Sequence, residues 1–171
     1  ILEKWPLAKE LLEVLVRCGG SRHFENLKLL AQVYLRLDDH REAYTLLSRA
    51  VSGDSKDVEA ITLLAQVCAA CGKYSEALGN HVRSIEVAPG STQARAAFFG
   101  TMLVLPEGFE ASPEILRLHR ENVSILAADP SGVLRAIRVN RHDGAFDLSG
   151  IQRELAKNAK SAAEVLEYSS K

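Results

Sequence analysis

The amino-acid sequence predicts an all-α protein, an α-solenoid of antiparallel helical hairpins with a capping segment at its C-terminal end. Three observations predict this fold. The pentapeptide of residues 29–33 returns unchanged at residues 63–67, which defines a 34-residue period. Apolar residues in both copies recur at intervals of three and four, which is the helical period. Glycine, proline and aspartate separate the periodic segments, as expected where helices end and turns begin.

The N-terminal segment, residues 1–20, predicts half of a hairpin. Residues 6–16 carry leucines at helical spacing on one side, including Leu7, Leu11 and Leu15. Gly19-Gly20 follows the last of them, and glycine commonly ends a helix. This helix lies where the second helix of a preceding hairpin would fall, so residues 1–20 are expected to form a partial N-terminal repeat.

Residues 24–57 predict the first complete hairpin. A helix is expected over Phe24–Arg36, followed by a turn at Asp38-Asp39 and a second helix over Ala43–Val51. Asp39 and Glu42 have the spacing of a capping box, which predicts that the second helix starts there.

Residues 58–91 predict the second hairpin. Its first helix carries Ile61 and Cys68 on one apolar side. Gly72 can take the left-handed conformation that ends a helix. Ser75 is the N-cap candidate for the helix after it, and Pro89-Gly90 stops that helix.

Residues 92–128 predict a degenerate third hairpin, so that the repeats together occupy residues 21–128. A helix is expected over Thr92–Leu105, and Ser112-Pro113-Glu114 opens another that runs to about Ala128. Residues 129–171 leave the period and are expected to cap the stack or to dock on a partner, because a terminal hairpin needs cover. Within them, the segment 133–139 fits either a helix or a strand.

The 34-residue helix-turn-helix period resembles the tetratricopeptide repeat family. The residues that carry the resemblance are Leu64-Ala65, Gly72-Lys73-Tyr74, Ala77 and Pro89. The match is strongest over residues 58–91 and extends to residues 24–57. It departs from the family pattern at the tryptophan position, which holds Leu27 and Ile61. The resemblance implies that the first helix of each hairpin lines a concave groove and that this groove binds another protein or an extended peptide.

Six residues are expected in this groove on the basis of the resemblance and the repeat. They are Lys28, Gln32, Arg36, Thr62, Gln66 and Gly100. The first three lie at i, i+4 and i+8, one stripe of a single helix. Charge and bulk decrease toward the third hairpin, so the expected ligand is an extended segment that is acidic at one end and apolar at the other.

Chaperone tails are not the expected ligand of this groove. Family members that bind them use a clamp of lysine, arginine and asparagine spread over three repeats. Only Lys28 fits that clamp, since Leu63, Gln93 and Ala97 occupy other clamp positions.

A second candidate site is a basic cluster near the C-terminal end. Arg135, Arg138 and Arg141 follow one another at three-residue steps, and His142 adjoins them. One interpretation is a site for an anionic partner. The alternative is a solvated face whose charges are balanced by neighbouring carboxylates.

No catalytic residues, cofactor or metal site are expected. Cys68 and Cys71 form a Cys-x-x-Cys pair, for which packing is favoured over a redox pair or zinc, because zinc needs four ligands. His81 is expected in the core, and the other histidines are scattered. Three cysteines do not make a disulfide framework in a chain of 171 residues. An intracellular, cytoplasmic protein is therefore expected.

The function predicted from the sequence is a protein-interaction scaffold or adaptor. A net charge of −1 and an aromatic content of 6% disfavour nucleic-acid binding, and no apolar stretch is long enough for membrane insertion. One alternative is a substrate-recognition fragment of a larger enzyme. The stretch from Leu105-Pro106 through Ser112-Pro113 to His119-Arg120 resembles the segment after the repeats in tetratricopeptide-bearing glycosyltransferases. The other alternative is a structural subunit that self-associates as a homo-oligomer.

Overall fold

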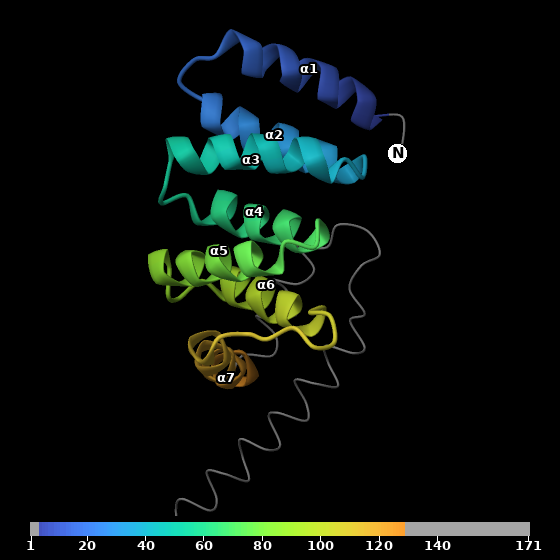
Figure 1. The fold of residues 1–171 in the computed structure, drawn as a ribbon. Helices are drawn as coiled ribbons and strands as arrows, with labels where there is room; N and C mark the ends of the chain where they lie inside the picture. The colour runs from blue at the N-terminus through green and yellow to red at the C-terminus, as the bar shows by residue number, and fades with distance from the viewer. Residues whose placement is uncertain (1–3, 129–171) are drawn as a thin grey trace, which may run out of the picture. The chain divides into compact units, whose positions relative to one another are not determined.

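The computed structural model of the protein describes residues 4–128. The chain divides into two compact units, residues Ile1–Pro89 and Gly90–Lys171. The described residues hold seven α-helices and no strand, which confirms the predicted all-α fold of helical hairpins (Figure 1). The predicted capping segment, residues 129–171, lies outside the described residues, and the predicted division at residues 20 and 128 stays a prediction.

The first unit contains five helices that follow one another in a stack (Figure 1). They are α1 (Lys4–Cys18), α2 (His23–Arg36), α3 (His40–Gly53), α4 (Val58–Ala70) and α5 (Tyr74–Val87). α2 packs on α3 and α4 packs on α5, so these pairs form the two predicted hairpins. α1 packs on α2, and α3 packs on α4, which joins each hairpin to the one before it.

The turns of the first hairpin follow from local chemistry. The side chain of Asp39 accepts a hydrogen bond of 3.2 Å from the backbone N–H of Glu42, which confirms the predicted cap of α3. Asp38 before it has a φ of 62°, a left-handed conformation that aspartate tolerates better than most residues. After α3, the side chain of Asp57 accepts a hydrogen bond of 3.0 Å from the N–H of Ala60 and so starts α4.

The turn of the second hairpin confirms one prediction and corrects another. Gly72 has a φ of 73° after the end of α4, as predicted for a left-handed glycine. The predicted N-cap at Ser75 is wrong, because α5 already begins at Tyr74 and Lys73 is its N-cap residue. No side-chain hydrogen bond caps α5.

Small residues at equivalent positions let the helices of the first unit approach closely. Ala31 and Ala65, which match each other in the two repeats, are completely buried, and so are Ala43 and Ala77. A larger side chain at these positions would push the paired helices apart. The residues at the family's tryptophan position, Leu27 and Ile61, are also fully buried. The core therefore repeats with the sequence period.

The second unit contains α6 (Thr92–Leu103) and α7 (Pro113–Ala128). Ser91 and Ser112 cap them, accepting hydrogen bonds of 3.2 and 3.3 Å from backbone N–H groups three residues on. α6 ends at Leu103, slightly before the predicted Leu105. Asn122 of α7 donates a 2.9 Å hydrogen bond to the carbonyl oxygen of Arg95, and this buried contact ties α7 to α6.

Candidate partner-binding site

The candidate site lies where α2 and α4 meet in the first unit. We use the name α2–α4 face for the surface formed by one stripe of each helix. Its members are Glu25, Lys28, Leu29, Gln32 and Arg36 on α2, and Glu59, Thr62, Leu63, Gln66 and Ala70 on α4. The 34-residue repeat makes the two stripes equivalent, so that glutamate, leucine and glutamine occur at matching positions on both helices.

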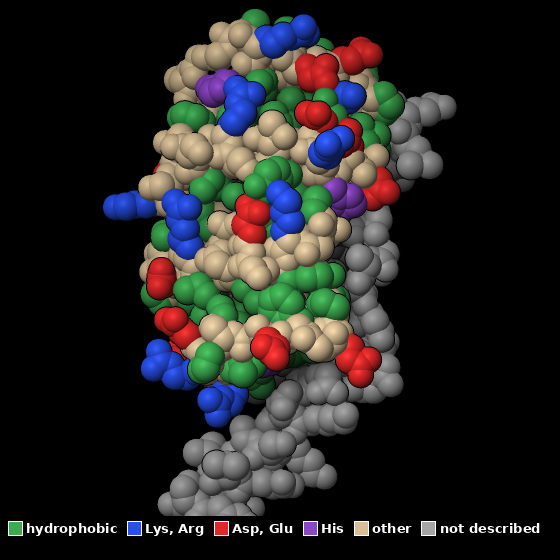
Figure 2. Space-filling view, in the orientation of Figure 1, with side chains coloured by type: hydrophobic (Ala, Val, Ile, Leu, Met, Phe, Trp, Pro, Cys, Tyr) green, Lys and Arg blue, Asp and Glu red, His purple; other side chains and the backbone are tan. Residues whose placement is uncertain are grey.

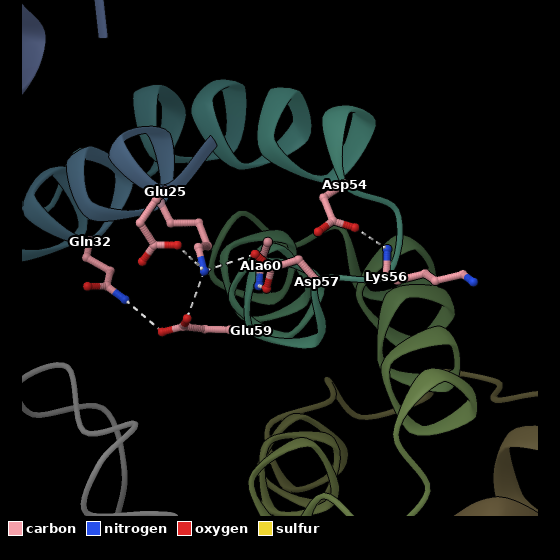
Figure 3. A network of polar contacts seen from close by, with 8 residues as sticks. Glu25, Gln32, Asp54, Lys56, Asp57, Glu59 and Ala60 are labelled. Atoms are coloured by element: carbon pink, nitrogen blue, oxygen red, sulfur yellow. Dashed lines mark hydrogen bonds and ion pairs between the residues drawn. The ribbon is translucent and has the colours of Figure 1, made fainter. Parts of the chain in front are cut away.

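Lys28 is the centre of a polar network on the α2–α4 face, and its partners Glu25, Asp57 and Glu59 are labelled in Figure 3. Its ammonium group lies 3.0 Å from a carboxylate oxygen of Glu25, 2.9 Å from Asp57 and 3.0 Å from Glu59. Asp57 and Glu59 belong to the start of the next hairpin, so the network joins α2 to α4. Lys28 is not an ordinary surface charge, because the residue is only 6% exposed.

The network shifts the pKa of two of its members. Burial alone would lower the pKa of Lys28, but hydrogen bonds to Asp57, Glu25 and Glu59 outweigh it and raise that pKa above its usual value. Burial opposes the charged form of Asp57 as well. The backbone N–H of Ala60 and the ammonium of Lys28 nevertheless hold the pKa of Asp57 below its usual range. Both groups therefore remain charged near neutral pH.

The α4 stripe carries two buried polar atoms without a hydrogen-bond partner. They are the hydroxyl oxygen of Thr62 and the side-chain carbonyl oxygen of Gln66. Thr62 is 2% exposed. On α2 the equivalent glutamine, Gln32, donates a 3.5 Å hydrogen bond to Glu59. A buried polar group without a partner costs free energy, so its presence calls for an explanation.

Two further residues complete the α2 stripe. The guanidinium of Arg36 lies 5.7 Å from the centre of the Trp5 ring, a cation–π contact with α1. Leu29, between Glu25 and Gln32 on the same stripe, is exposed. The face thus offers carboxylates at one end, an apolar side chain in the middle and a guanidinium at the other end.

Sequence reasoning missed the two glutamates of this face. Glu25 and Glu59 are separated by one repeat period and have the same position in their helices. That recurrence was a signal in the sequence, like the one that identified Gln32 and Gln66. The remaining predicted residues lie elsewhere: Gly100 is buried in α6 of the second unit, while Arg135, Arg138, Arg141 and His142 lie outside the described residues.

The cysteine pair is only partly as predicted. Cys68 is fully buried, and burial together with Glu76 raises the pKa of its thiol to about 12. Cys71 is exposed, so the packing role predicted for the pair holds for Cys68 and is wrong for Cys71. In residues 4–128 no group of three or more histidine, cysteine, aspartate or glutamate side chains is arranged to hold a metal ion. His81 is fully buried, as predicted.

Two tyrosines join neighbouring elements of the first unit in the same way. The hydroxyl of Tyr34 donates a 2.8 Å hydrogen bond to Glu13 of α1, and that of Tyr44 donates a 2.8 Å hydrogen bond to Glu76 of α5. A lysine near each glutamate lies over the tyrosine ring, at 4.8 Å for Lys9 and 3.7 Å for Lys73. These contacts hold α1 against α2, which carries Tyr34, and α5 against α3, which carries Tyr44.

The described surface carries both charge signs. Figure 2 shows lysine, arginine, aspartate and glutamate side chains interspersed on the visible face, without a large field of one sign. α1 presents exposed apolar residues at helical spacing, which are Leu7, Leu11, Val14 and Leu15. Among the described residues, no helix combines the length and the apolar character that crossing a membrane requires.

Comparison with known proteins agrees with the repeat geometry. Residues 7–82 match the family model described as "Anaphase-promoting complex, cyclosome, subunit 3", a model of tetratricopeptide-type repeats. The helical hairpins of the first unit are thus repeats of the tetratricopeptide type, which in general mediate protein–protein interactions and are typically non-catalytic. No curated protein matches the chain.

Proposed function

We propose that this protein is a non-catalytic interaction module, a scaffold or adaptor, whose α2–α4 face binds a segment of a partner protein. The single observation that carries the proposal is the recurrence of glutamate, leucine and glutamine at equivalent positions on the two first helices. Glu25, Leu29 and Glu59 are exposed and do not fill the core, whereas Leu63 is buried. A repeated stripe with exposed members is what a solenoid uses to contact an extended ligand.

The exposed thiols support an intracellular location for this interaction module. Cys18 and Cys71 are exposed and unpaired. Free surface thiols are typical of reducing compartments, and we place the protein inside the cell, in the cytoplasm.

Site-specific photo-crosslinking in cells tests the proposed face. A photo-reactive amino acid at Gln32, on the α2–α4 face, should capture one or more defined partner proteins. The same amino acid at the exposed Arg41 of α3 is the matched control and should not capture the same proteins. Capture from Arg41 alone, or equal capture from both positions, would show that this face is not the working surface.

A second candidate function, self-association, is favoured by the apolar side of α1. Leu11 and Leu15 are 59% and 49% exposed on adjacent turns, and such a stripe is typical of helix pairing. Light scattering is the test. A dimer that becomes a monomer after Leu11→Glu with Leu15→Glu would support this function, and a monomeric wild-type protein would exclude it.

A further inference from the structure

Negative charge exceeds positive charge within the network around Lys28. Three carboxylates, from Glu25, Asp57 and Glu59, lie within 3.0 Å of one ammonium group, that of Lys28. Two negative charges therefore remain unbalanced within the network. The side chain of Lys28 is 8% exposed, whereas those of Glu25 and Glu59 are 54% and 49% exposed. The surface that a ligand meets here consists of carboxylate oxygens.

Polar groups that lack a partner lie on the same stripe of α4. Thr62 lies one turn after Glu59 and Gln66 lies two turns after it, spacings that keep all three side chains on one side of a helix. The Thr62 hydroxyl oxygen and the Gln66 carbonyl oxygen are both buried without a hydrogen bond. A carboxamide presents one donor and one acceptor side by side, which is the pattern that a peptide group complements.

We propose that the α2–α4 face binds an extended partner segment that contains lysine or arginine. The basic side chain contacts the exposed carboxylates of Glu25 and Glu59 on the solvent side of Lys28, and a main-chain amide group of the same segment bonds to the carboxamide of Gln66. This inference rests on the proposed function and deepens it by naming the chemistry of the partner. It reverses the sequence-based expectation of a ligand that is acidic at this end of the groove.

The helix geometry sets the spacing within the ligand. Glu59 and Gln66 are separated by two helical turns, and a helix rises about 1.5 Å per residue, so the two side chains start about 10 Å apart. An extended chain advances about 3.3 Å per residue. The basic residue and the recognised amide group should therefore lie about three residues apart. Leu29, exposed on the same face, can contact an apolar side chain of the segment.

Charge complementarity distinguishes this ligand from an anionic one. An acidic peptide or a nucleic acid would bring its charge against Glu25 and Glu59, and like charges at close range are unfavourable. A guanidinium or ammonium group instead gains two carboxylate partners. Because both glutamates are about half exposed, the attraction should be sensitive to salt.

The test uses a displayed library of random-sequence peptides, selected on the full chain. Enriched peptides are synthesised with a fluorescent label, and their dissociation constants are measured by anisotropy. The double variant Glu25→Gln with Glu59→Gln removes the proposed charge partners. Glu10→Gln with Glu86→Gln is the matched control, since it changes the net charge by the same amount at exposed residues outside the face.

We expect enriched peptides to share a lysine or arginine, and to bind the Glu25/Glu59 double variant about tenfold or more weakly, equivalent to about 1.4 kcal/mol. Binding to the control variant should be unchanged. Replacing Gln66→Leu should weaken the same peptides, and replacing the shared basic residue by norleucine should remove the effect of the glutamate variant. Circular dichroism of each variant checks that the helices remain folded.

Three outcomes would overturn the inference. The first is a set of enriched peptides without a common basic residue, and the second is equal binding to the glutamate and control variants. The third is a selection that enriches no peptide. Photo-crosslinking at Gln32 separates these failures from failure of the proposed function. If a partner is captured at Gln32 and any of these three outcomes is also observed, the α2–α4 face still binds a partner. Only the proposal that the ligand is basic is then rejected.

Discussion

His81 lies one repeat period after Leu47, and both side chains are completely buried at the same position of their hairpins. An imidazole thus occupies a site that the previous repeat fills with a leucine. Burial lowers the pKa of His81 to about 3. The histidine is therefore a neutral core residue at neutral pH, and its protonation opposes folding.

The first prediction concerns the pH dependence of stability. Below pH 6.5 the unfolded chain protonates His81, while the folded chain does not until about pH 3. The contribution of His81 to the free energy of unfolding is thus fully present above pH 6.5 and is lost as the pH falls toward 3. Between pH 7 and pH 5 this residue should lower the free energy of unfolding by about 2 kcal/mol. Urea titrations at both pH values measure this change.

His81→Leu is the matched variant for that prediction, because it copies Leu47 of the preceding repeat. It should reduce the pH dependence by about the same 2 kcal/mol. His119, whose pKa is also lowered by burial, contributes in the same direction and leaves some dependence in the variant. If the free energy of unfolding changes equally with pH in the wild type and the variant, the prediction for His81 is wrong.

The second prediction concerns the network around Lys28. Lys28→Met leaves three carboxylates close together without their shared cation, so the free energy of unfolding should fall by roughly 2 kcal/mol. Lys56→Met, at an exposed lysine just before the Asp57 cap of α4, is the control and should change stability by less than about 0.5 kcal/mol. Equal effects of the two substitutions would show that the network contributes nothing to stability.

The third prediction compares two helical glycines. A Cβ atom added at Gly53, the last residue of α3, would overlap the ring of Phe24, whereas one added at Gly79 within α5 meets nothing within 4 Å. Gly79→Ala should therefore stabilise the protein by about 0.5–1 kcal/mol, since alanine favours helix. Gly53→Ala should destabilise it by about 1 kcal/mol, because the ring must move. Thermal melts measure both changes.

A double-mutant cycle tests the cause of the difference. In a Phe24→Ala background the overlap is absent, and Gly53→Ala should become neutral or stabilising. The ring also lines an open pocket of about 430 Å³ between α2 and α3, so the double variant should keep its fold. If Gly53→Ala destabilises the protein equally in both backgrounds, the ring is not the obstacle.

The fourth prediction concerns thiol reactivity. Cys18 and Cys71 are exposed and should react rapidly with a thiol-specific reagent at neutral pH. Cys68 is fully buried and the pKa of its thiol is raised to about 12, so it should react only after unfolding. Counting the modified thiols before and after denaturant measures this. Fast reaction of all three cysteines in the folded protein would contradict the burial of Cys68.

The sequence was sufficient for those features that repeat or that depend on neighbouring residues. The 34-residue period predicted the hairpins, and local turn chemistry predicted the cap at Asp39 and the left-handed Gly72. The start of α5 was not predicted, because no side-chain hydrogen bond marks it and Ser75 already lies inside the helix. The burial of Lys28 was not predicted either. Two of its three partners, the α4 cap Asp57 and the first-turn residue Glu59, approach it only when α4 stacks on the first hairpin.

The position of the single tryptophan has a practical consequence. Trp5 lies on α1, which has no buried residue, and its ring contacts Arg36 of α2. Intrinsic tryptophan fluorescence therefore monitors whether α1 is attached to its neighbour, and not whether the repeats are intact. Elements with little buried surface open at lower free energy than the core. A fluorescence transition that precedes the loss of helical circular dichroism should be interpreted as fraying of one helix, and backbone hydrogen exchange should be fastest in the same segment.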